Sequence, residues 1–228
     1  MTGKKKKKQT HLTAGSHIGA GVDVGHCSGV RDRYAACGSA TEYYEKYGAQ
    51  YQNPHEAQVL ALLRANETRV DYSRTLDFCA GSGEVTLALQ RNARGGRFED
   101  RKVLACDPFT ADAFALRTGT PLDWEFSFED VARGALDEVV APHQRFSACV
   151  CSFALHLAPE ALLWPVCHAL LRVSARLVII TPHKRPVLEL VDPEKIELEF
   201  ADETPTERGK MVRLKCYKLR SIDTTINN

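Results

Sequence analysis

The sequence Thr75-Leu-Asp-Phe-Cys-Ala-Gly-Ser-Gly-Glu-Val-Thr86 passes through three kinds of local structure. Residues Thr75–Phe78 predict a buried strand, the small residues Ala80–Gly83 predict a tight turn, and the amphipathic spacing of Val85–Arg91 predicts a helix. Glycine permits positive φ and a close approach of the backbone to a ligand. The first N–H groups of the following helix have no partner within the helix, so they point at that ligand. The segment therefore predicts a site for a nucleotide-like molecule.

Two acidic residues narrow this prediction. Asp77 lies inside the first strand, and a second predicted strand, Val103–Asp107, ends in an acid. A lone glycine turn is weak evidence, because dinucleotide enzymes use one as well. An acid at the carboxyl end of the second strand of a doubly wound sheet is placed to accept hydrogen bonds from both ribose hydroxyls of an adenosine.

On these residues the chain resembles the class I S-adenosylmethionine-dependent methyltransferases, whose first motif is an acid followed by a Gly-x-Gly-x-Gly-like turn. Cys79 stands where that motif usually has its first glycine. The resemblance covers roughly residues 70–219 and implies an enzyme with S-adenosyl-L-methionine as cofactor. The cofactor contacts that it implies in this region are Asp77, Cys79, Ala80, Gly81, Gly83, Asp107 and Pro108.

Further strands are predicted along the chain. They are Leu122–Phe126, Phe146–Cys151, Arg176–Thr181, and the alternating pair Lys195–Phe200 and Met211–Tyr217. The pair flanks a turn at residues 204–209 and predicts a hairpin. A helix is predicted over Val131–Val140. The expected fold is an α/β, Rossmann-like doubly wound sheet of seven strands with a C-terminal antiparallel hairpin.

The segments after three of these strands carry further candidate site residues. Ser127–Asp130 has the pattern of a capping box, and in the family this turn also brackets the adenine, which makes Phe128 and Glu129 candidates. Ser152 and Phe153 resemble the family's motif at the sulfonium end of the cofactor. His156 and His183 follow two strands at the carboxyl edge of the sheet, where either can act as a general base.

The N-terminal region divides at about residue 40. Residues 1–40 contain few apolar residues and predict a largely disordered basic tail, followed by a single methyltransferase domain over residues 41–228. Residues 41–66 are expected to form a lid that carries Tyr43, Tyr47, Tyr51 and His55 at the substrate side. The alternative is that these tyrosines only pack the predicted helix Pro54–Asn66 onto the sheet.

Composition limits the class of protein and its partners. No apolar run is long enough to span a membrane, and Lys4–Lys8 is not followed by the apolar segment of a secretory signal. The scattered cysteines indicate buried thiols in a reducing compartment, so we expect a cytoplasmic location, with nuclear targeting as an alternative role for the lysines. His26, Cys27 and Cys37 lack zinc-ligand spacing, and no metal is expected.

The charge balance bears on nucleic acid. The net charge is +1, but without Lys4–Lys8 there remain 25 basic and 29 acidic residues, a charge of −4. The lysines are expected to give at most weak, salt-sensitive contact with RNA.

The methyl acceptor is not specified by the sequence. Neither the Asn-Pro-Pro-Tyr motif of amino-group methylation nor the Pro-Cys motif of cytosine methylation follows Phe146–Cys151. A small-molecule acceptor is favoured. The alternatives are a cap- or tRNA-type RNA methyltransferase, a protein methyltransferase, and a non-catalytic binding module with this fold; the terminal hairpin disfavours a nicotinamide dehydrogenase.

Overall fold

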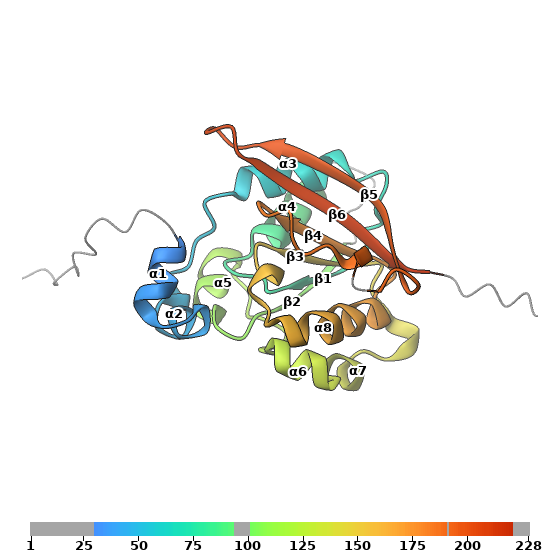
Figure 1. The fold of residues 1–228 in the computed structure, drawn as a ribbon, viewed down its shortest axis with the longest axis horizontal. Coiled ribbons are helices and arrows are strands. Elements are labelled where there is room, and N and C mark those ends of the chain that lie inside the picture. The colour runs from blue at the N-terminus through green and yellow to red at the C-terminus, as the bar shows by residue number, and fades with distance from the viewer. Residues whose placement is uncertain (1–29, 94–100, 191, 221–228) are drawn as a thin grey trace, which may run out of the picture.

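The computed structural model describes residues 30–93, 101–190 and 192–220, which surround one mixed sheet with the strand order β2-β1-β3-β4-β6-β5 (Figure 1). The strands are β1 (Arg74–Phe78), β2 (Lys102–Cys106), β3 (Ala148–Ser152), β4 (Leu177–Thr181), β5 (Ile196–Pro205) and β6 (Met211–Leu219). The first four are parallel, and β6 and β5 form the antiparallel hairpin. The α/β class and the hairpin are confirmed.

The expected count of seven strands is wrong for the described residues, because the segment Leu122–Phe126 forms only a single bridge between Trp124 and Cys106. Pro121 has no N–H to donate at the start of this segment. The side chain of Asp123 accepts the Ala105 N–H at 2.8 Å, in place of a backbone carbonyl. The chain therefore leaves the edge of β2 after one bridge.

Helices cover both faces of the sheet (Figure 1). They are α1 (Val30–Cys37), α2 (Ala40–Tyr47), α3 (Glu56–Ala65), α4 (Glu84–Ala93), α5 (Ala111–Thr118), α6 (Phe128–Arg133), α7 (Ala135–Val139) and α8 (Glu160–Val173), with single 3-10 turns at η1 (Gly48–Gln50), η2 (Pro142–Gln144), η3 (Leu155–Leu157) and η4 (Leu188–Leu190). Helices α6, α7 and α8 bury their apolar residues on one face, and α3 and α4 do so on the other. Parallel strands covered on both faces are buried throughout, as in β3 and β4.

The helix expected over Val131–Val140 is divided at Gly134, which has φ of 103° and separates α6 from α7. The predicted capping box is confirmed: the Ser127 side chain accepts the Asp130 N–H, and the Asp130 carboxylate accepts the Ser127 N–H at 2.9 Å. The box fixes the start of α6 beside the end of β2, where the candidate site lies.

Helix α1 lies within the residues for which we expected a disordered tail, so described structure begins at Val30, ahead of residue 41. Lys4–Lys8, His26 and Cys27 lie outside the described residues. Within the described ranges no helix is long and apolar enough to cross a membrane, and no cluster of metal-binding side chains occurs.

Candidate functional site

A pocket of about 460 Å³ lies at the carboxyl ends of β1, β2 and β3, the edge at which open α/β sheets bind ligands. Nine of the sequence-predicted residues line it: Cys79, Gly81, Asp107, Pro108, Phe128, Glu129, Ser152, Phe153 and Tyr51. The structure therefore brings together residues from both acidic strands, the capping box and the segment after β3.

Asp107 organises the glycine turn. Its Oδ2 accepts the Gly81 N–H at 3.0 Å, and its Oδ1 accepts the N–H groups of Phe109 at 2.9 Å and Thr110 at 3.1 Å. Burial raises the pKa of this carboxyl. Each carboxylate oxygen has two lone pairs, so Asp107 can hold the turn and still accept a hydrogen bond from a ligand hydroxyl in the pocket.

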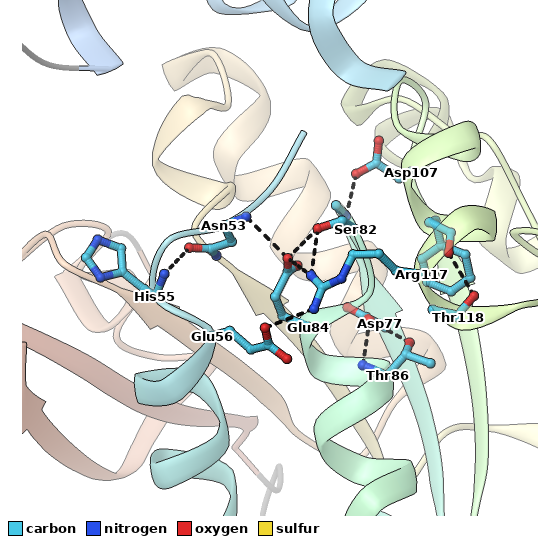
Figure 2. A network of polar contacts seen from close by, with 12 residues as sticks. Asn53, His55, Glu56, Asp77, Ser82, Glu84, Thr86, Asp107, Arg117 and Thr118 are labelled. Atoms are coloured by element: carbon cyan, nitrogen blue, oxygen red, sulfur yellow. Dashed lines mark hydrogen bonds and ion pairs between the residues drawn. The ribbon is translucent and has the colours of Figure 1, made fainter. Parts of the chain in front are cut away.

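Asp77 does not line the pocket; it lies below the turn and is fully buried. Its Oδ2 accepts the Thr86 N–H at 3.1 Å and the Thr86 hydroxyl at 2.8 Å, which ties β1 to the first turn of α4 (Figure 2). No donor in the described part of the chain reaches its Oδ1. Burial raises the pKa of Asp77 to about 8. The first-motif acid thus anchors the helix that follows the turn.

The other two glycine-turn candidates also sit behind the pocket. Ala80 is buried and its N–H donates to the Cys106 carbonyl at 3.1 Å. Gly83 has φ of 85°, and a Cβ there would lie 2.5 Å from Thr118 Cγ2, so this glycine is needed for packing against α5. Neither residue lines the pocket.

Two pocket residues that are not glycine have left-handed backbone conformations, Cys79 and Phe153, both with φ of 57°. Such conformations cost free energy in non-glycine residues and gather at functional sites. Cys79 therefore adopts the conformation that a glycine at this motif position would adopt freely. A hydrogen bond with Cys151 and burial raise the pKa of the Cys79 thiol, so it stays protonated.

A buried polar network connects the turn to α3 and α5 (Figure 2). Glu84 accepts hydrogen bonds from the Ser82 hydroxyl and from the Asn53 N–H, the latter at 3.3 Å. Arg117 of α5 contacts Glu84 at 2.7 Å and Glu56 at 2.9 Å. Because Glu84 is almost fully buried, this pairing compensates its charge. The network fixes the chain just after the tyrosine-rich segment against the glycine turn.

The tyrosine-rich segment covers part of the pocket, and of the four lid residues that we expected only Tyr51 lines it. Tyr44 and Tyr51 line the pocket, whereas Tyr43 packs against Tyr44 and Tyr47 packs against Tyr43. Burial raises the pKa of the Tyr44 and Tyr51 hydroxyls, which therefore stay protonated. A Cβ on Gly81 would lie 2.7 Å from the Tyr51 ring, so this ring lies directly over the turn.

The three candidate histidines, His55, His156 and His183, lie near the pocket but do not line it. His55 stacks on Phe153, with ring centroids 5.0 Å apart and an interplanar angle of 9°. The ring centroids of His156 and His183 are 4.4 Å apart. His156 belongs to η3, between the pocket residues Ala154 and Leu157. The two candidate bases therefore form one pair at the carboxyl edge.

Sequence reasoning missed part of the lining. The missed residues are Ala40, Thr41, Tyr44, Glu45, Phe109, Thr110, Phe126, Ser127, Ala154, Leu157 and Pro159. Those near Ser127 and Phe153 are neighbours of predicted residues and were within reach of the same motifs. Those of α2 were not, because nothing local in the sequence shows which helical face meets the pocket.

Comparison with known proteins identifies relatives by sequence and by fold. No family model matches it. It is 31% identical to the uncharacterized protein C17A5.05c of Schizosaccharomyces pombe, over 70% of this chain and 77% of that protein. Its fold is similar to the N-methyltransferase NodS from Bradyrhizobium japonicum WM9, crystallised with S-adenosyl-L-homocysteine, with a TM-score of 0.54 and 11% identity over 75% of this chain and 90% of that one.

A second solved structure is magnesium protoporphyrin IX methyltransferase from Synechocystis PCC 6803 with bound SAM, with a TM-score of 0.50 and 14% identity over 86% of this chain and all of that one. At these identities the likeness concerns the fold. The chain belongs to the family of the Schizosaccharomyces pombe protein, and its fold is that of the class I S-adenosylmethionine-dependent methyltransferases.

Proposed function

We propose that this protein is an S-adenosylmethionine-dependent methyltransferase. The observation that carries the proposal is the composition of the pocket: the Gly81 turn and Asp107 lie at its floor, and aromatic side chains form its walls. A nucleoside with a charged amino-acid end needs such a combination of apolar surface and a few convergent polar groups.

The residues fit the cofactor part by part. Asp107 is placed to accept a hydrogen bond from a ribose hydroxyl with the lone pair that Oδ2 has left. Phe128 and Glu129, held by the Ser127 capping box, offer an apolar face and an acid to the adenine. The backbone at Gly81 has no side chain to exclude the remaining amino-acid end. Asp77 supports this arrangement from below.

The cofactor supplies a methyl group on a sulfonium, and positive charge is lost as the methyl leaves. Catalysis of such a displacement rests on positioning the acceptor and on excluding water. Tyr44 and Tyr51 cover the pocket from above, and Phe153 projects into it beside Ser152. We propose that these residues act as the lid and that they enclose the acceptor as well as the cofactor.

A proton acceptor is required only where the methyl acceptor retains its proton. The His156–His183 pair at the same edge is our proposal for this role, since imidazole titrates near neutral pH. Because the cofactor occupies much of this pocket of about 460 Å³, the acceptor can place only its reacting group there. Such a group can belong to a small molecule or to one unit turned out of a polymer.

The test is calorimetric titration of S-adenosylmethionine and S-adenosylhomocysteine into the full chain. We expect micromolar binding, and at ligand 100-fold above Kd a stabilisation of about 2.7 kcal/mol in thermal unfolding. Glu129→Gln should weaken binding while leaving the free protein's stability unchanged, because Glu129 is exposed. A matched variant, Glu125→Gln, changes an exposed acid nearby that is outside the pocket lining and should leave binding unchanged. No binding of either compound to the folded protein would refute the proposal.

A further inference from the structure

Two basic segments flank the side of the site that the cofactor residues do not occupy. One is His183-Lys-Arg185, directly after β4, and the other is Arg208-Gly-Lys210 in the turn between β5 and β6. The four Lys and Arg side chains are exposed. Among the described residues, none of them takes part in an ion pair with an acid. Their charges are therefore available to a partner.

The sheet brings both segments to the carboxyl edge. Thr181, the last residue of β4, is paired with Arg213 near the start of β6. The Lys215 ammonium donates to the carbonyls of Lys184 and Pro186, both at 3.1 Å, which holds the first segment against β6. Figure 1 shows the β5–β6 turn extending toward the same side of the molecule as α1 and α2.

The second segment also lies near the aromatic wall of the pocket. Burial lowers the pKa of His55, and the positive charge of Lys210 lowers it further. His55 stacks on Phe153, which lines the pocket, whereas His55 does not. Phe153 thus presents its remaining surface to the pocket and is supported from behind by a parallel ring. Its backbone is fixed by the hydrogen bond from Phe153 N to Ile180 O at 2.8 Å.

Flat aromatic surfaces beside exposed cations suit one kind of ligand in particular. Single-stranded nucleic acids and nucleotides are bound by stacking their bases on aromatic side chains and by neutralising their phosphates with Lys and Arg. A neutral small molecule would leave the four cations without a counter-charge, and an acidic peptide has no nucleobase to stack on Phe153. The pair of features therefore distinguishes between acceptor classes.

We propose that the methyl acceptor is a nucleotide unit, with its base at Phe153 and its phosphates at Lys184, Arg185, Arg208 and Lys210. This inference rests on the proposed methyltransferase function and names the substrate class of that site. The net charge of −4 outside Lys4–Lys8 does not oppose it, because recognition depends on the local cluster. The nucleotide comes either free or as one unit of a single-stranded RNA.

The experiment measures binding to the full chain in the presence of S-adenosylhomocysteine. The probe is a fluorescent single-stranded RNA of mixed sequence, about ten nucleotides long, which matches common site sizes. Nucleoside monophosphates and uncharged nucleosides serve as competitors. The variants are K184A/R185A and R208A/K210A. The control, K102A/R133A, removes two exposed charges from β2 and α6, outside both basic segments.

Each site variant should bind the RNA about tenfold more weakly at physiological salt, with a log–log salt slope shallower by about 1.4. The control should lose less than about twofold, because its charges contact no phosphate. Phe153→Leu keeps an apolar side chain of similar volume, and should cost about tenfold through lost stacking. Affinity for S-adenosylhomocysteine should stay unchanged in both double variants, which shows that they fold and that the cofactor site is separate.

The arms distinguish the sources of the nucleotide. RNA binding that depends on the two segments supports a polymer. Binding of nucleoside monophosphates in a direct calorimetric titration, without RNA binding, supports a free nucleotide. Equal affinity of the control and both site variants would overturn the inference, as would equal competition by nucleosides and monophosphates. RNA binding that is abolished by replacing Lys4–Lys8 with alanine and is unaffected in both site variants would also overturn it. If the unmodified chain does not bind S-adenosylhomocysteine, the methyltransferase proposal is refuted instead. Failure of the nucleotide inference and failure of the methyltransferase proposal can therefore be told apart.

Discussion

The replacement Asp77→Asn should change the pH dependence of folding stability in one direction. Burial raises the pKa of Asp77 to about 8 in the folded protein, above the ordinary value of 3.8 that applies in the unfolded chain. Between these values the unfolded chain releases the proton and the folded protein keeps it. The contribution of Asp77 to the free energy of unfolding is therefore fully present below about pH 4 and is lost as the pH rises through 8.

The size of the effect follows from the linkage. The loss is at most about 1.4 kcal/mol per pH unit, so it is at most about 4 kcal/mol between pH 5 and 8. Asparagine does not titrate, so the Asp77→Asn variant lacks this loss. Its new N–H₂ group replaces an oxygen that no described donor reaches, and a buried donor without an acceptor costs about 1–3 kcal/mol at every pH. The absolute stability thus reports two effects, and the pH dependence reports one.

The assay is urea unfolding at pH 5, 6, 7 and 8, followed by far-UV circular dichroism. The free energy of unfolding of Asp77→Asn minus that of the unmodified protein should rise steadily across this range. Asp130→Asn is a control of opposite sign, because hydrogen bonds from Ser127 lower the pKa of Asp130. Its deficit should be constant from pH 5 to 8 and should shrink in a further measurement at about pH 3. Parallel profiles for Asp77→Asn and the unmodified protein would refute the reasoning.

Three further outcomes are expected. Gly48→Ala places a Cβ 2.2 Å from the Phe109 carbonyl oxygen, so it should destabilise the protein by about 1–3 kcal/mol and increase proteolysis at residues 40–51. Unchanged proteolysis would mean that the lid does not dock there. Cys79→Gly relieves the left-handed strain but loses thiol burial, so it should be within about 1 kcal/mol of neutral, whereas Cys79→Val should cost at least about 2 kcal/mol in chemical unfolding; equal costs would contradict the strain argument. His156→Gln or His183→Gln should lower kcat about 100-fold and remove the acidic limb of the pH–rate profile without changing S-adenosylhomocysteine affinity; an intact limb would exclude the pair as base.

The elements that could be predicted from the sequence are those with a strong local signal. The β1–turn–α4 unit, the acid after β2, the capping box at Ser127 and the terminal hairpin are each encoded by residues that are close together in the chain. The expected strand at Leu122–Phe126 has suitable alternation, but the pattern does not show that Asp123 takes the hydrogen bond of a neighbouring strand. The α6–α7 helix breaks at Gly134, where the backbone takes the left-handed conformation that glycine adopts most readily.

Site residues were predictable where a motif fixes backbone position, and less so where a side chain's direction decides. Asp77 and Gly83 occupy the expected motif positions, yet neither faces the pocket. The Asp77 carboxylate contacts Thr86, and a Cβ on Gly83 would point at Thr118. Tyr44 lines the pocket and its neighbour Tyr43 does not, and the sequence of α2 alone does not show which of its faces meets Asp107. Side-chain direction on a short helix depends on tertiary contacts, which a single sequence does not reveal.

The site combines a rigid floor with a cover of fewer contacts, and this division has a consequence for binding. The turn is held without any ligand by the Gly81–Asp107 bond and by the Glu84–Arg117 pair, so a ligand that binds there need not order it. The cover is held less tightly. It includes the short helices α1 and α2, and no described residue of α2 is buried. Tyr51 lies over Gly81, where the amino-acid end of the cofactor is expected to approach. We therefore propose that the cover moves when the cofactor enters while the turn stays in place, so that the conformational cost of binding falls on residues 40–51.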